Sequence, residues 1–205
     1  LLEVAQSAKA DSDCLLALGL LGDPAALQSL YDSLKNPNLV DSATLALNWI
    51  TGAQLFEDVF APDEVNEDEL FENELQAWRE RKEAPKRADG KPFGQTIRKL
   101  SPNKDIWKRW FADNAAKFDM NLRYRSGKPY TPDSLLENLA EEGSDHQLRK
   151  FAAEELVIRY GCDVPFEVDM PVTQQLRAIQ EIQAWVHANG HRFQPGLWYF
   201  AGRLQ

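Results

Sequence analysis

The sequence predicts an all-α fold, organised as an α-solenoid of helical hairpins that a charged, irregular insertion interrupts. Three observations support this prediction. Hydrophobic residues recur at helical spacing, and Gly, Pro and Asn mark the ends of these runs. Two motifs also recur at fixed offsets, one of 29 positions (Ala17 to Ala46) and one of 75 (Trp110 to Trp185). Self-similarity at a fixed period is typical of repeat proteins, whose modules share a core and offer surfaces to partners.

Residues 1–52 are predicted to form the first helical hairpins. Gly22 ends an apolar run that begins at Cys14, and Asp23 and Pro24 fit the cap and the first position of the next helix. Gly52 ends the last helix of this segment. Two helices are predicted from residues at helical spacing, one from Leu27, Leu30, Tyr31 and Leu34, the other from Val40, Ala43, Leu47 and Ile50.

Residues 53–103 are predicted to be a charged insertion that is partly irregular. Nine acidic residues lie between positions 57 and 74 without an intervening Lys or Arg, and six basic residues follow between 79 and 91. Charge blocks of this kind are typically solvated. Two alternatives remain open: the segment is an arm that docks a protein partner, or its acidic and basic halves pair with each other.

Residues 104–205 are predicted to hold a third helical pair and the two copies of the longer motif, continuous with the rest of one domain. Pro132 opens one helix, which Gly143 ends, and Ser144 with Gln147 forms a capping box for the next. We expect the last helix at 173–188. The motif contains Trp110, Asn114, Phe118 and Tyr124 in its first copy and Trp185, Asn189, Phe193 and Tyr199 in its second.

These eight aromatic and Asn residues are interpreted as structural, because one fold unit used twice needs the same fastening twice. The alternative is a recognition surface, since Trp and Tyr dominate interface hot spots. Residues that differ between the copies are better candidates for partner contact. The predicted binding residues are therefore Lys108, Arg109 and Trp198, together with the acidic run Glu64, Glu67, Asp68, Glu69, Glu72 and Glu74.

The run Ala17-Leu18-Gly19-Leu20-Leu21-Gly22-Asp23-Pro24 resembles the HEAT-like repeats first described in phycobilisome lyases. The pattern Trp107-x-x-Trp110-Phe111-x-x-Asn114-x-x-Lys117-Phe118 is similar to a largely uncharacterised proteobacterial family of HEAT-repeat proteins, some of whose members lie near type VI secretion genes. The resemblance implies an all-helical fold with no known catalytic residues. Family members are longer at the N-terminus, so we expect residues to precede Leu1.

Composition limits the partners. The 205-residue chain has a net charge of −9, which argues against general binding to nucleic acid or to anionic membrane and favours a basic protein. No apolar run approaches the roughly 18 residues that span a bilayer. Cys14 and Cys162 are predicted to be buried thiols, which favours a cytoplasmic location.

No motif predicts catalysis, a cofactor or a metal site. Gly90-Lys91-Pro92 and Gly127-Lys128-Pro129 lack the upstream Gly and the Ser or Thr of a phosphate-binding loop. His187 and His191 are four residues apart, but Gly190 lies between them and no further ligand is near. We therefore expect a non-catalytic protein–protein interaction module, an adaptor or an immunity-type partner of a secretion-associated protein. The alternatives are an enzyme or lyase accessory of HEAT-like type and a structural subunit of an assembly.

Overall fold

A computed structural model describes residues 2–7, 10–141 and 146–205 of the chain. It divides into two compact units, which we call the helical unit (residues 1–54 and 102–205) and the arm (residues 55–101). The predicted end of a helix at Gly143 and the capping residue Ser144 lie outside the described residues.

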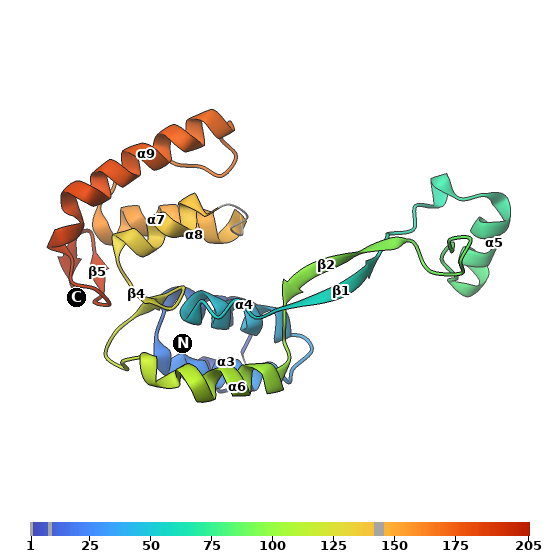
Figure 1. The fold of residues 1–205 in the computed structure, drawn as a ribbon, viewed down its shortest axis with the longest axis horizontal. Coiled ribbons are helices and arrows are strands. Elements are labelled where there is room, and N and C mark those ends of the chain that lie inside the picture. The colour runs from blue at the N-terminus through green and yellow to red at the C-terminus, as the bar shows by residue number, and fades with distance from the viewer. Residues whose placement is uncertain (1, 8–9, 142–145) are drawn as a thin grey trace. The chain divides into compact units, whose positions relative to one another are not determined.

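The helical unit contains α-helices, short helical turns and four two-residue strands (Figure 1). Its α-helices are α1 (Leu2–Ala5), α2 (Ser12–Leu21), α3 (Leu27–Ser33), α4 (Val40–Thr51), α6 (Lys104–Asn114), α7 (Pro132–Ala140), α8 (His146–Glu155) and α9 (Val172–Asn189). The turns are η1 (Pro24–Ala26), η3 (Ala115–Lys117), η4 (Leu156–Tyr160) and η5 (Gly190–Arg192). The strands are β3 (Tyr124–Arg125), β4 (Lys128–Pro129), β5 (Tyr199–Phe200) and β6 (Arg203–Leu204).

The predicted all-α solenoid is wrong. The described residues include three two-stranded antiparallel sheets, β1–β2, β3–β4 and β5–β6, so the fold is mixed α and β. The predicted stacking of helical hairpins fails at the end of α4, where the β3–β4 hairpin packs instead of a further helix. Helical periodicity identified the helices, but it carries no information about which element covers the end of each one.

The helices predicted near the N-terminus are confirmed. Asp11 caps the start of α2, because its side chain accepts a hydrogen bond from the Cys14 amide at 2.8 Å. Gly22, with φ of +69°, caps its C-terminal end. α2 packs closely on α4, because a Cβ atom at Gly19 would lie only 2.8 Å from the Cα of Ala46. Small residues at this crossing let the two backbones approach and bury the large side chains around them.

A hydrophobic core holds α7, α8 and α9 together. Its most buried members are Tyr130, Leu135, Leu139, Ala152, Leu156 and Ile182. The predicted helix at 173–188 is confirmed as α9, which begins and ends within one residue of those limits. This core completes the support on which the C-terminal strands lie.

The arm combines regular elements with irregular segments at residues 63–66 and 82–93. β1 (Phe56–Pro62) pairs with β2 (Gly94–Leu100) in an antiparallel ladder that runs from Phe56 opposite Leu100 to Pro62 opposite Gly94 (Figure 1). Between the strands lie η2 (Glu67–Glu69) and α5 (Glu72–Arg81). Opposite charges face each other across the ladder, which favours this register. The charged pairs are Asp58 with Arg98 and Glu57 with Lys99.

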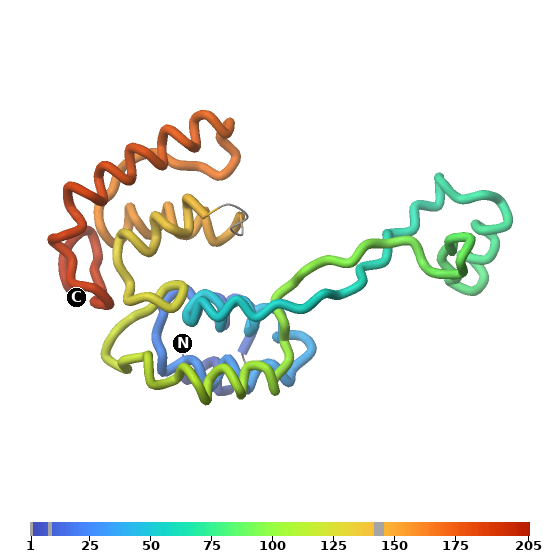
Figure 2. The backbone as a smooth tube through the Cα atoms, in the orientation of Figure 1, coloured from blue at the N-terminus to red at the C-terminus, as the bar shows by residue number. Residues whose placement is uncertain are grey.

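Two short hairpins cap the ends of two helices, and these hairpins are the strands of the duplicated motif. The amides of Ser126 and Gly127 donate to the carbonyls of Trp49 and Ile50, at 2.7 and 2.9 Å. In the second copy, the amides of residues 201 and 202 donate to the carbonyls of residues 158 and 159, both at 2.8 Å. Figure 2 shows the chain turning back after α6, before the first hairpin, and again after α9, before the second hairpin. Each turn therefore satisfies carbonyls that a helix C-terminus leaves without a partner.

Two buried arginines, Arg125 on β3 and Arg159 on η4, share the carboxylate of Glu155 on α8. Arg125 donates to Glu155 at 2.7 Å and to the Tyr130 hydroxyl at 2.9 Å, and Arg159 forms an ion pair with Glu155 at 3.2 Å. Both arginines also reach the Leu20 carbonyl at 3.4 Å, at the C-terminal end of α2. Desolvation by burial lowers the pKa of Arg159 to about 10. One carboxylate therefore holds two cations in a largely buried site.

Glycine is needed unequally in the two hairpin turns. Gly127 and Gly202 have φ of +77° and +74°, but an added Cβ would lie 2.5 Å from the Thr51 carbonyl oxygen at Gly127 and 3.6 Å from the Tyr160 carbonyl oxygen at Gly202. We expect Gly202→Ala to cost about 1 kcal/mol through backbone strain, and Gly127→Ala to cost about 2 kcal/mol more through overlap. Urea unfolding of both variants measures the difference, and equal losses would contradict the capping contact at Gly127.

Removing the Glu155 carboxylate should lower the free energy of unfolding far more than removing the carboxylate of its exposed neighbour, Glu154. Glu155→Gln leaves two buried cations without a counter-charge, and we expect it to lower the free energy of unfolding by about 3 kcal/mol or more. The matched control is Glu154→Gln. Glu154 forms an exposed pair with Lys150 at 4.0 Å, so its loss should lower the free energy of unfolding by about 0.5 kcal/mol or less. Thermal unfolding of both variants tests this, and similar melting temperatures would refute the assigned role of Glu155.

Candidate functional site

The acidic residues predicted to bind a partner lie at the end of the arm that carries η2 and α5. The Asn66 side chain caps η2, because its oxygen accepts from the Asp68 amide at 3.2 Å while its nitrogen donates to Glu69 at 2.8 Å. Glu74 accepts from the Phe71 amide at 3.0 Å at the start of α5. Glu64, Glu67, Asp68, Glu69 and Glu72 are exposed, and Glu74 is half-buried.

The acidic and basic halves of the arm pair with each other at one position. Arg79 donates to Glu67 from two nitrogens, at 2.8 and 2.9 Å, and both side chains are exposed. Within the described part of the chain, Glu64, Asp68 and Glu72 form no ion pair. The surface therefore keeps three carboxylates free for a basic partner.

A hollow of about 360 Å³ adjoins Glu64, one of these three carboxylates. Apolar and acidic side chains line this hollow, from residues 62–74, which begin at the end of β1, and residues 84–93 before β2. The apolar members include Val65, Leu70, Phe71, Pro92 and Phe93, and the acidic ones are Asp63, Glu64, Glu69 and Glu74. A hollow with this lining is chemically suited to the long apolar stem and cationic head of a Lys or Arg side chain.

The arm has no buried hydrophobic side chain. All of its residues are described, and each hydrophobic one is exposed or half-buried. Phe71, at 76% exposure, is the extreme case. The other large exposed hydrophobic residues of the arm are Phe56, Phe60, Phe93 and Ile97. Sequence reasoning named five anchors of a docking arm as a minor alternative: Phe56, Phe60, Leu70, Phe71 and Trp78. The structure exposes the three Phe side chains and half-buries Leu70 and Trp78.

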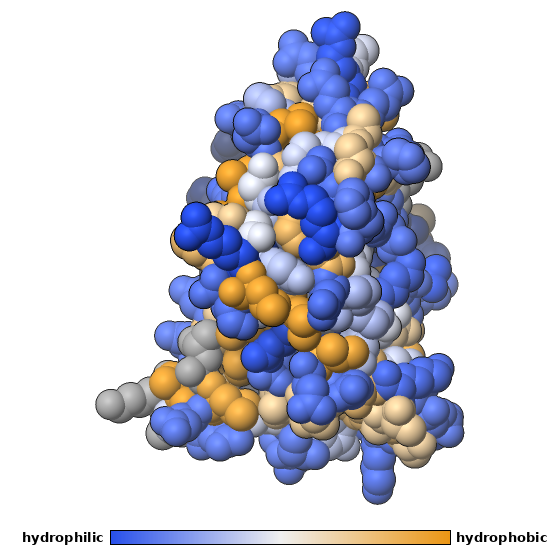
Figure 3. Space-filling model, turned by 90° about the vertical axis from the view of Figure 1, so that its left-hand side faces the viewer, coloured by the Kyte–Doolittle hydropathy of each residue, from blue (hydrophilic) through white to orange (hydrophobic). Residues whose placement is uncertain are grey.

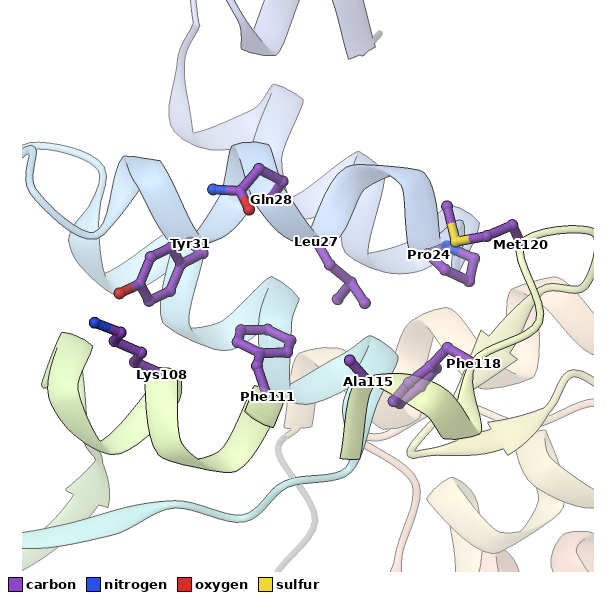
Figure 4. Close-up of a pocket in the computed structure, with 9 residues that line it drawn as sticks. All are labelled: Pro24, Leu27, Gln28, Tyr31, Lys108, Phe111, Ala115, Phe118 and Met120. Atoms are coloured by element: carbon purple, nitrogen blue, oxygen red, sulfur yellow. The ribbon is translucent and has the colours of Figure 1, made fainter. Parts of the chain in front are cut away.

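A second candidate site, the α3–α6 groove, lies within the helical unit. It has a volume of about 470 Å³ and is lined by Pro24, Leu27, Gln28, Tyr31, Lys108, Phe111, Ala115, Phe118 and Met120. Figure 4 shows Leu27 and Phe111 pointing into the space between the helices, with Tyr31 and Lys108 at one end and Pro24 and Met120 at the other. The lining is mainly apolar with one cation, so it fits an apolar ligand or side chain with a nearby negative charge.

Lys108 is therefore the one predicted contact residue that lines this groove. Arg109 is exposed on the same helix, and its Nε donates to the Asp105 carbonyl at 3.3 Å. Trp198 is half-buried, and its ring lies 3.5 Å from the Arg159 guanidinium. The structure does not bring these three residues together with the acidic run into one site within a single unit.

In the first copy of the motif, the aromatic residues form one cluster. The Phe118 ring lies 6.1 Å from Trp110 and 4.8 Å from Tyr124, and the Tyr124 hydroxyl accepts from the Asp119 amide at 2.8 Å. The Asn114 side chain donates to the Trp110 carbonyl at 2.8 Å. These contacts hold the loop against the helix end.

The second copy repeats the same contacts. Phe193 lies 6.3 Å from Trp185 and 5.0 Å from Tyr199, whose hydroxyl accepts from the Gln194 amide at 2.9 Å. Asn189 donates to the Trp185 carbonyl at 2.9 Å. The sequence suggested that both copies fasten one helical pair. The hairpins that they deliver instead cap two different elements, α4 and η4, which follows α8.

Sequence reasoning missed the buried group of Arg125, Glu155 and Arg159. One local signal could have found part of it, because Glu155 and Arg159 are four residues apart on a predicted helix. Arg125 carries no such signal, since its partner is 30 residues away. The α3–α6 groove was missed for the same reason: its two walls come from segments far apart in the chain.

Filling the groove should remove binding of an aromatic anion. The fluorescent sulfonate ANS combines apolar rings with a negative charge, so we expect it to bind the groove near Lys108. Ala115→Phe places a ring in the groove and should weaken ANS binding about tenfold. Ala116→Phe is the matched control, because Ala116 is exposed and does not line the groove. A fluorescence titration that finds no difference between the two variants would exclude the groove as the ANS site.

Neither a metal site nor a membrane-spanning helix in the described part of the chain, nor a related protein, points to a function. Among the described residues, no group of three or more His, Cys, Asp or Glu side chains could hold a metal ion. In the same part of the chain, no helix combines the length and apolar character needed to cross a membrane. No protein-family model, curated protein or solved structure matches the chain. The surfaces described above are therefore the basis for a functional proposal.

Proposed function

We propose that this chain is a non-catalytic protein-binding module and that the arm is its docking element. The observation that carries the proposal is that residues 55–101 bury no hydrophobic side chain while exposing four Phe residues and Ile97. A unit of this size gains little stability from a core of its own. Exposed aromatic residues on such a unit are typical of interfaces, where they become buried on binding.

The charge of the arm supports a basic partner. Glu64, Asp68 and Glu72 form no ion pair with any described residue, and Glu64 lines the hollow beside Phe71. Complementary charge steers a partner and sets its orientation, while burial of Phe71 supplies affinity. The sequence resemblance described above favours an adaptor or an immunity-type role beside a secreted protein. The two buried cysteines, Cys14 and Cys162, support a cytoplasmic location.

The α3–α6 groove supports a second candidate function, the binding of a small apolar ligand. Its volume and its mainly apolar lining fall within the range of small-molecule sites. The lining of the groove contains no His, Cys or carboxylate. The groove therefore favours a protein that binds a ligand as an accessory to an enzyme such as a lyase, and not one that is itself the catalyst.

The arm proposal is tested by affinity capture from the native host. The variant Glu64→Lys, Asp68→Lys, Glu72→Lys reverses the three free carboxylates, and Phe71→Ala removes the most exposed ring. We expect each to reduce recovery of one basic protein at least tenfold, with thermal stability unchanged because these side chains are exposed. The control variant Asp113→Lys, Asp163→Lys, Glu181→Lys makes the same charge change on exposed sites of the helical unit.

The proposal requires that recovery of the captured protein depend on the side chains of the arm and not on the net charge of the chain. Recovery that falls equally in the arm variant and in the control would show a nonspecific charge effect. Recovery that is unchanged in both arm variants would remove the arm from consideration.

A further inference from the structure

The two copies of the duplicated motif end in faces of the same kind, one covered and one open. The first hairpin face consists of Trp49, Arg125 and Tyr130, at the end of α4 and on the β3–β4 hairpin. These residues are 1%, 0% and 0% exposed. The first face is thus almost completely removed from solvent.

The helical pair α7–α8 covers the first hairpin face through three contacts. Phe151 lies edge-on to Trp49, with ring centroids 6.1 Å apart. Glu155 accepts from Arg125 at 2.7 Å, and Glu137 forms an ion pair with Lys128 at 2.7 Å. An apolar ring and two carboxylates are therefore the chemistry that this face binds within the chain.

The second hairpin face is built in the same way, and the corresponding residues are exposed. Ile158 stands where Trp49 stands, because the carbonyl of each accepts the first amide of its hairpin turn. Ile158 is 53% exposed, and Phe200, which corresponds to Arg125, is 59% exposed. Arg203 lies directly opposite Phe200 across the β5–β6 ladder, so the two side chains share one side of the hairpin. Figure 3 shows hydrophobic side chains among strongly hydrophilic ones at the height of the β5–β6 hairpin.

The residues of the second face define what would cover it. Phe200 replaces a cation, so the position that Glu155 occupies on the first face calls for a hydrophobic side chain here. Arg203 corresponds to Lys128, keeps the positive charge and forms no ion pair with any residue that the structure describes. A carboxylate in the place of Glu137 would satisfy it.

We propose that the second hairpin face docks a two-helix segment of a partner polypeptide, with hydrophobic side chains against Ile158 and Phe200 and a carboxylate at Arg203. The precedent is the contact of α7–α8 with the first face. A second copy that met this face with its own would bring two Arg203 guanidinium groups together and supply no carboxylate from the face. A helical segment of complementary charge is therefore favoured over self-association. This surface is separate from the arm, so the inference does not depend on the proposed function.

The probe is the chain's own helical pair, added to the full chain. Residues 131–161 are appended after Gln205, so that they follow Gln205 as α7 follows Tyr130, with Glu155→Leu in the added copy to meet Phe200. Docking is measured by disulfide formation between Ile158→Cys and Phe151→Cys in the added copy. Val172→Cys in place of Ile158→Cys is the control, because Val172 is 69% exposed and lies on α9 outside the face.

We expect disulfide formation at position 158 to be at least tenfold faster than at position 172. Phe200→Asp should abolish that advantage without unfolding the chain, since Phe200 is exposed. Leaving Glu155 unchanged in the added copy should weaken docking, because a carboxylate would face Phe200. Arg203→Glu should also weaken it, and Glu137→Arg in the added copy should restore it by reversing the pair.

Equal rates at positions 158 and 172, or rates that Phe200→Asp does not change, would overturn the proposal. Sedimentation of the chain without the added helices supplies an independent outcome. A dimer that Phe200→Asp converts to a monomer would assign the face to a second copy and would also overturn the proposal, whereas a monomer agrees with it.

Discussion

The helical unit depends on one hydrogen-bonding arrangement used twice, in which the turn of a short hairpin donates two amides to the last carbonyls of a helix. Carbonyls at a helix C-terminus have no partner within the helix, and leaving them buried without one is costly. Ser126 and Gly127 satisfy the end of α4, and residues 201 and 202 satisfy the end of the helix that includes Tyr160. The aromatic clusters of Phe118 and Phe193 hold each loop so that its turn reaches these carbonyls.

The same arrangement explains why charges are buried in the middle of the unit. The β3 strand that completes the first hairpin carries Arg125 into the interior, where Glu155 and the Leu20 carbonyl accept from it. Glu155 comes from α8, so the pair joins the first capped helix to the second. A buried ion pair of this kind is weak evidence for stability as such, but breaking it is costly, and it fixes how the two parts meet.

The arm follows a different physical logic from the helical unit. Its ladder satisfies the backbone hydrogen bonds of β1 and β2 and pairs charges across the strands, yet it buries no hydrophobic side chain. Phe71 lies outside the ladder, at the start of α5, and its side chain is exposed to solvent. The helical unit therefore supplies a stable body with a groove and an open hairpin face, while the arm presents aromatic and acidic side chains on a separate unit.

The sequence by itself predicted α2, α3, α4 and α9, the glycine ends of α2 and α4, and the equivalence of the two motif copies, because each depends on residues within a few helical turns. It did not predict α5. The alternation in β1 and the short strands beside the turns at Ser126 and Ala201 were overlooked, so the predicted fold class was wrong. Only the tertiary structure decided the pairing of β1 with β2, the helix that each hairpin caps, and the partner of Arg125. These contacts join residues far apart in the chain, and the spacing of apolar and charged residues records the local period and not the distant partner. For the same reason, the acidic run could be recognised as a candidate surface, but the open face around Phe200 could not.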